Sequence, residues 1–80
     1  MIQASATGTS VSFAFTDTKL AGAECTVRVI AADGKRKDQP FQVAANGTCQ
    51  GQVEVSDLKR PLRVVYLGVR GLTSEEAVVA

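Results

Sequence analysis

Apolar and polar residues alternate along most of this chain, and this two-residue period is typical of half-buried β-strands rather than of helices. In the segment 10–17, Val11, Phe13 and Phe15 fall on one side, and serine, alanine and threonine residues fall on the other. The pattern predicts six further strands, the first and last of them short, at 2–7, 24–34, 40–47, 48–57, 62–71 and 75–80.

Turn-forming residues separate these segments. They gather at Gly8, Asp17 to Gly22, Asp33-Gly34, Asn46-Gly47, Ser56 to Pro61 and Arg70 to Ser74. Short strands with turn signals roughly every eight to twelve residues indicate an antiparallel sandwich. We therefore predict an all-β, seven-stranded antiparallel β-sandwich, with a short helical turn within 73–80 as the alternative for the last segment.

The same alternation predicts the side chains that face the core. The aligned sets are Cys25, Val27 and Val29, then Phe41, Val43 and Ala45, then Cys49, Gly51, Val53 and Val55. The segment 62–71 is almost entirely apolar, as expected of a central strand. Its core-facing residues are expected to be Val64 and Tyr66.

The second half of the chain resembles a fibronectin type III domain. In that family a strand ends in a leucine, a turn with a proline follows, and an apolar strand leads through a serine-containing loop to the last strand. Leu58 and Pro61 match the turn, 62–69 matches the apolar strand, and Ser74 matches the loop.

The segment 10–17 is also similar to that family's second strand, with Phe15 in place of a buried tryptophan. Val64 stands where the family has a tyrosine, and the chain's single tyrosine is Tyr66. The resemblance is therefore to the immunoglobulin-like class as a whole. It implies an immunoglobulin-like or fibronectin III-like β-sandwich that binds or spaces other proteins and carries out no chemistry.

Length and charge narrow the functional classes. The 80 residues suffice for one small domain, expected over residues 1–80 and interpreted as a piece of a longer protein. Nine basic and eight acidic side chains give a net charge of +1, so no nucleic-acid partner is expected. No stretch approaches the roughly eighteen apolar residues of a membrane span, so no membrane insertion is expected.

The two cysteines are the strongest candidates for a covalent feature. Cys25 and Cys49 open the third and fifth predicted strands, which puts both at the same end of the sandwich. A disulfide between them would stabilise a small domain by about 3 kcal/mol, and it would indicate an extracellular or cell-surface protein. The alternative is two buried free thiols in a cytosolic protein. Two cysteines without histidine do not make up a usual zinc ligand set, so no metal and no cofactor is expected.

Asn46-Gly47 allows more than one interpretation. The pair favours a type I′ hairpin turn, because asparagine and glycine tolerate positive φ angles. Asn46-Gly47-Thr48 is also an N-glycosylation pattern, which applies only along a eukaryotic secretory route. The turn is the preferred interpretation, with the disulfide at Cys49 expected to fix the hairpin's register.

Two surface features could contact partners. Lys35, Arg36 and Lys37 gather at a predicted hairpin tip, either as a solvated tip or as a contact for an acidic polymer. A second candidate is an outward apolar strip that could pack on a neighbouring domain, on another protein or on a weakly bound second copy. The strip comprises Ile30, Val65, Leu67 and Val69. The alternative is that a bulge, a covering segment or a shifted register buries it.

These observations indicate a non-catalytic module. The chain has no histidine, and no base is identifiable that could activate a serine or threonine. We expect a spacer or protein-contact domain of an exported or cell-surface protein, with bacterial origin suggested by the alanine- and valine-rich composition. The alternatives are a carbohydrate-associated module of a secreted hydrolase, and a structural component of a phage or secretion assembly.

Overall fold

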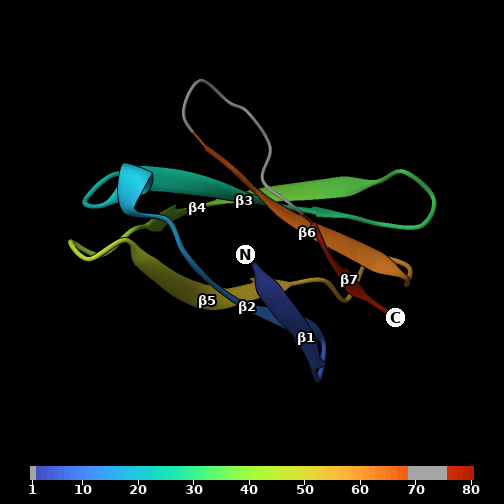
Figure 1. Ribbon diagram of the computed structural model, residues 1–80. Coiled ribbons are helices and arrows are strands. Elements are labelled where there is room, and N and C mark those ends of the chain that lie inside the picture. The colour runs from blue at the N-terminus through green and yellow to red at the C-terminus, as the bar shows by residue number, and fades with distance from the viewer. Residues whose placement is uncertain (1, 69–75) are drawn as a thin grey trace.

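The computed structural model describes residues 2–68 and 76–80, and these residues form an all-β molecule of two antiparallel sheets (Figure 1). One sheet has three strands in the order β1-β2-β5, and the other has four in the order β4-β3-β6-β7. The strands are β1 (Gln3–Thr7), β2 (Ser10–Thr16), β3 (Glu24–Ile30), β4 (Arg36–Gln42), β5 (Thr48–Glu54), β6 (Leu62–Leu67) and β7 (Ala77–Val79). A short 3-10 helix, η1 (Thr18–Leu20), joins β2 to β3.

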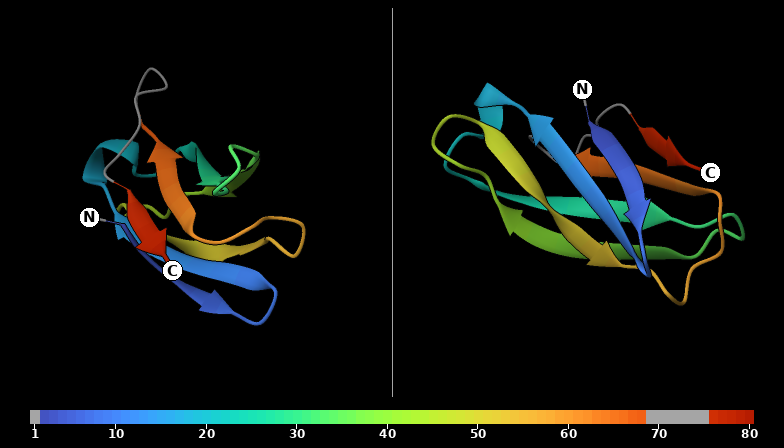
Figure 2. Two further views of the ribbon diagram at one scale, coloured as in Figure 1. Left: turned by 90° about the vertical axis from the view of Figure 1, so that its right-hand side faces the viewer. Right: turned by 90° about the horizontal axis from the view of Figure 1, so that it is seen from below.

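The core lies between the two sheets, where the alternation placed it. Val11, Phe13 and Phe15 of β2 are buried, as are Cys25, Val27 and Val29 of β3. Val64 and Tyr66 of β6 complete the set from the central part of the larger sheet. The views in Figure 2 show the two layers crossing at a modest angle, as expected when twisted sheets pack face to face.

The last segment is a strand rather than a helical turn over its described part, because β7 pairs antiparallel with β6. Residues 73–75, where the helical turn was to begin, lie outside the described residues.

The fourth strand begins earlier than the sequence pattern indicated. The alternation placed it at 40–47, whereas β4 begins at Arg36 and pairs with β3 from Ile30 to Glu24. The pattern failed because β4 is an edge strand whose inward positions include Lys37 and Gln39 rather than apolar residues. Inward charge on an edge strand is a common protection against pairing with another chain.

Lys37 connects β4 and β5, which are edge strands of the two different sheets. Its Nζ donates a hydrogen bond of 2.9 Å to the backbone carbonyl of Glu54 on β5, and it lies 3.8 Å from the Asp57 carboxylate. Proline at position 40 further limits pairing along β4, because it has no backbone N–H.

Gly51 makes room for an aromatic pair between the sheets. The Phe13 and Phe41 rings meet edge to face with their centroids 4.7 Å apart. A Cβ at position 51 would lie 2.7 Å from Cε1 of Phe41, closer than real Cβ contacts allow. The glycine that the alternation placed on the inner face of β5 is therefore required by packing.

Candidate functional site

Cys25 and Cys49 are both buried free thiols, so the expected disulfide is wrong. They occupy the second positions of β3 and β5, which belong to opposite sheets. The Cys25 thiol donates to the carbonyl oxygen of Leu67 at 3.4 Å, on the strand next to β3. Cys25 is thus a buried thiol of the core, and the register of β5 is held without a cross-link.

The environment of the thiols keeps them protonated near neutral pH. Burial raises the pKa of Cys25 to about 11, and the nearby charge of an ionised Cys49 adds to the effect. Burial also raises the pKa of Cys49. Because the thiolate is the nucleophilic form of cysteine, neither residue is activated for nucleophilic chemistry.

A carboxylate and a phenol meet at the same end of the sandwich. The Tyr66 hydroxyl donates to Oδ2 of Asp17 at 3.0 Å, and the Tyr66 ring stacks on Phe15 with centroids 3.8 Å apart. The other carboxylate oxygen of Asp17 accepts the backbone N–H of Lys19 at the start of η1. Both oxygens are thus used to hold the chain together, which is a structural role.

Asn46 and Gly47 form a turn, but not the predicted hairpin. The strands on either side, β4 and β5, lie in different sheets, so the turn carries the chain across the sandwich. The Asn46 side chain accepts the backbone N–H of Thr48 at 3.0 Å, and Gly47 has a φ of 88°. Asn46 is exposed, and its glycosylation stays a prediction.

The predicted apolar strip is interrupted. Ile30 and Leu67 are partly exposed on the outer face of the four-stranded sheet, whereas Val65 between them is only 5% exposed. Val69 lies outside the described residues. Within the described part of the chain, Val78 is the exposed large hydrophobic residue, at 61%. The contact role of this strip stays a prediction.

An ion pair lies on the same outer face of the four-stranded sheet. Arg28, directly opposite Val65 in the register, makes a two-pronged ion pair with Asp38 at 2.8 and 2.9 Å. The Arg28 guanidinium holds the pKa of the Asp38 carboxyl below its usual range. This pair makes the middle of the face polar rather than apolar.

The three predicted basic residues lie at the turn between β3 and β4 and at the start of β4. Lys35 lies in the turn between β3 and β4, whose Asp33 carboxylate accepts the Lys35 backbone N–H. Arg36 and Lys37 begin β4 and point to opposite faces of the sheet, since Lys37 reaches the carbonyl of Glu54. A contact of this tip with an acidic polymer stays a prediction.

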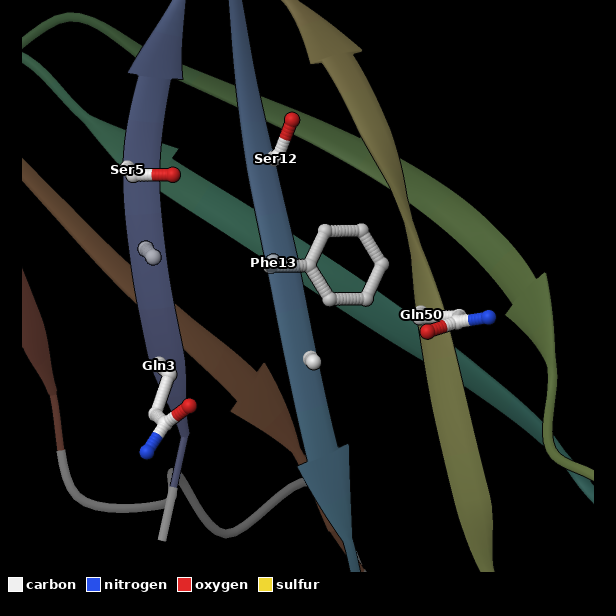
Figure 3. Close-up of a pocket in the computed structure, with 7 residues that line it drawn as sticks. Gln3, Ser5, Ser12, Phe13 and Gln50 are labelled. Carbon is white, nitrogen blue, oxygen red and sulfur yellow. The ribbon is translucent and has the colours of Figure 1, made fainter.

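A hollow that the sequence pattern did not predict lies on the outer face of the three-stranded sheet. It has a volume of about 440 Å³, and Figure 3 shows Gln3 on β1 and Gln50 on β5 lying on either side of β2. Both glutamines are opposite Ala14, so the three residues form one row across the sheet. The alternation along each strand already places these residues on the outward face. It predicts a hollow only when the order of the three strands is known.

No site for a metal or a membrane emerges from the described residues. Over 2–68 and 76–80, no three histidine, cysteine, aspartate or glutamate side chains gather in a way that could hold a metal ion. The described chain likewise contains no helix with the length and apolar character needed to cross a membrane.

Comparison with protein-family models, with curated protein sequences and with solved structures gave no match to this chain.

Proposed function

We propose that this chain is a non-catalytic, immunoglobulin-like or fibronectin III-like module that spaces or contacts other domains of a larger protein. The observation that carries the proposal is the strand order, with β1-β2-β5 packed against β4-β3-β6-β7. The chain crosses between sheets after β2, β4 and β5, as chains do in sandwiches with Greek-key connections. The strand that follows Pro61 is β6, inside the larger sheet, in agreement with the sequence resemblance.

The direction of the first and last strands supports a spacing role. β1 and β7 lie side by side at one edge of the sandwich, and their arrows point the same way in both views of Figure 2. A chain that enters along β1 and leaves along β7 keeps its direction along the strands. Modules of this kind can follow one another head to tail.

Spacing is favoured over a large apolar contact. A protein-contact face usually offers a contiguous apolar patch, whereas here Arg28 and Asp38 lie across the outer face of the larger sheet. Among the described residues, the exposed large hydrophobic side chain is Val78. A contact through Ile30 and Leu67 is the second candidate.

The thiols bear on the location of the protein. Export was expected because of a Cys25–Cys49 bond, and the two free thiols withdraw that support. Reduced cysteines are the usual state in the cytosol, so these residues fit the cytosolic alternative.

The test is the shape of two copies of the chain joined end to end in one polypeptide, measured by small-angle X-ray scattering. One copy is 33 Å long. A head-to-tail spacer predicts a maximum dimension close to twice that length, and a compact pair with its sheets side by side would contradict it. Sedimentation of the single chain tests the second candidate, because Leu67→Glu should then abolish association while the far-ultraviolet circular dichroism stays unchanged.

A further inference from the structure

We propose that the hollow between Gln3 and Gln50 is a binding site for a neutral oligosaccharide. The proposed binding site belongs to the three-stranded sheet alone, so its failure would not contradict the proposed spacing role. The lining of the hollow includes Gln3, Ser5, Ser12, Ala14 and Gln50.

Two uncommitted amides face the same opening. Gln3 and Gln50 are separated by two strand spacings, about 9.5 Å, with the small side chain of Ala14 between them. Within the described part of the chain, neither glutamine side chain has a hydrogen-bond partner in the protein. Each amide therefore offers two N–H donors and a carbonyl acceptor to a ligand.

Other polar side chains of the same face, including Ser12 in the lining of the hollow, are bonded within the protein. Ser12 is hydrogen-bonded to Thr7 at 3.0 Å and to the Gln52 side chain at 3.3 Å. Further along, Glu54 accepts from the Thr9 and Ser10 hydroxyls at 3.2 and 3.3 Å. The free hydrogen-bonding capacity of the hollow thus lies mainly with Gln3 and Gln50.

The chemistry of the hollow selects the ligand class. None of the described residues that line it is charged, so an ionic ligand gains no ion pair there. Its one aromatic residue, Phe13, is 4% exposed and contributes little apolar surface. Primary amides pair donor and acceptor at one side chain, which matches neighbouring sugar hydroxyls that each donate and accept.

The floor of the site permits close approach. Figure 3 shows the Ser5 and Ser12 hydroxyls above a floor made by β1 and β2, and Ala14 adds only a methyl group. The hollow continues toward Thr16 and Thr48 in one direction and toward Gln52 in the other. A linear oligosaccharide fits this open trough better than a compact ligand, and binding at an open site is expected to be weak.

The experiment is a titration of the ¹⁵N-labelled chain with maltohexaose, cellohexaose and chitohexaose, followed by two-dimensional NMR. At least one of these probes is expected to shift the side-chain amide signals of Gln3 and Gln50 and the backbone signal of Ala14 in a saturable way. The double variant Gln3→Ala/Gln50→Ala should weaken binding about tenfold, because each lost hydrogen bond to a ligand weakens binding severalfold. Glu54→Gln is the matched control, because Glu54 lies on the same face but outside the trough, and it should bind within about twofold of the unaltered chain.

Four results would overturn the proposal. Three of them are the absence of saturable shifts with all three probes, equal binding by the double variant, and stronger binding of an anionic hyaluronan hexasaccharide than of the neutral sugars. Shifts that depend on protein concentration rather than on sugar would show instead that the face contacts a second copy, which also contradicts it. Thermal unfolding of each variant confirms that a loss of binding does not reflect a loss of fold.

Discussion

The Tyr66 hydroxyl donates a hydrogen bond to Asp17 across 49 residues of sequence, and this contact joins the larger sheet to the loop that ends β2. The Tyr66 ring lies almost parallel to that of Phe15, at an interplanar angle of 7°. One side chain thus links both sheets at the end of the sandwich that also holds the two thiols.

Removal of this hydroxyl should destabilise the fold without disturbing the ring stack. We expect Tyr66→Phe to lower the free energy of unfolding by about 1 to 2 kcal/mol, because a part-buried carboxylate loses a donor. Urea unfolding measures the change, and Asp17→Asn completes a double-mutant cycle with it. A coupling energy near zero in that cycle would mean that the hydrogen bond contributes nothing to stability.

Gly47 and Gly34 form a matched pair for backbone packing. Both have positive φ, 88° and 91°, but a Cβ at Gly47 would lie 2.9 Å from the Asp17 carbonyl oxygen, whereas one at Gly34 meets nothing within 4 Å. Gly34→Ala should cost about 1 to 2 kcal/mol from the backbone conformation alone. Gly47→Ala should cost about 1 to 3 kcal/mol more, because the neighbouring backbone has to move. Equal losses in thermal or urea unfolding would show that the loop from β4 to β5 does not press against the end of β2.

Lys37 should stabilise the sandwich although it is charged. Lys37→Met keeps the aliphatic stem but removes the donor to the Glu54 carbonyl, so we expect a loss of about 1 kcal/mol and faster aggregation through the exposed edge of β5. Lys35→Met is the control, since it removes one positive charge from the adjacent turn. Chemical unfolding and light scattering distinguish the two variants. If they behave alike, net charge explains the effect rather than the bond to β5.

The thiols predict a loss of stability in alkaline solution. The pKa of Cys25 is about 11 in the folded chain and 9.0 when the group is unperturbed, so the unfolded chain releases its proton first as the pH rises. The thiol's contribution to stability is therefore complete below about pH 9 and is lost between pH 9 and about 11. The free energy of unfolding, measured across that range, should fall less steeply in Cys25→Ala than in the unaltered chain. Identical slopes would show that the buried thiol does not titrate as described.

The sequence predicted the strands whose inner faces are apolar. Val11, Phe13 and Phe15 alternate cleanly, and so do Cys25, Val27 and Val29, because each strand has the core on one side. The start of β4 was predicted too late in the chain because its inward Lys37 bonds to the neighbouring edge strand and does not pack in the core. Hydrophobic alternation cannot reveal a strand whose inner face is partly polar.

The contacts that make up the candidate sites depend on which strands are neighbours in the two sheets. The disulfide was inferred because Cys25 and Cys49 share one end of the sandwich, but the shared end does not decide whether two neighbouring buried thiols are bonded. The Tyr66–Asp17 contact and the Gln3–Ala14–Gln50 row each join residues far apart in the chain. Such pairs follow from strand order and register, which local patterns do not specify.

The sandwich itself is tested most directly by nuclear Overhauser effects measured by NMR on the labelled chain. The account predicts strong contacts between the ring protons of Phe15 and Tyr66, together with cross-strand backbone contacts between Ala14 and Gln50 and between Val27 and Tyr66. Backbone contacts without any contact between the two rings would mean that the sheets do not face each other through this core, and the account would then be wrong.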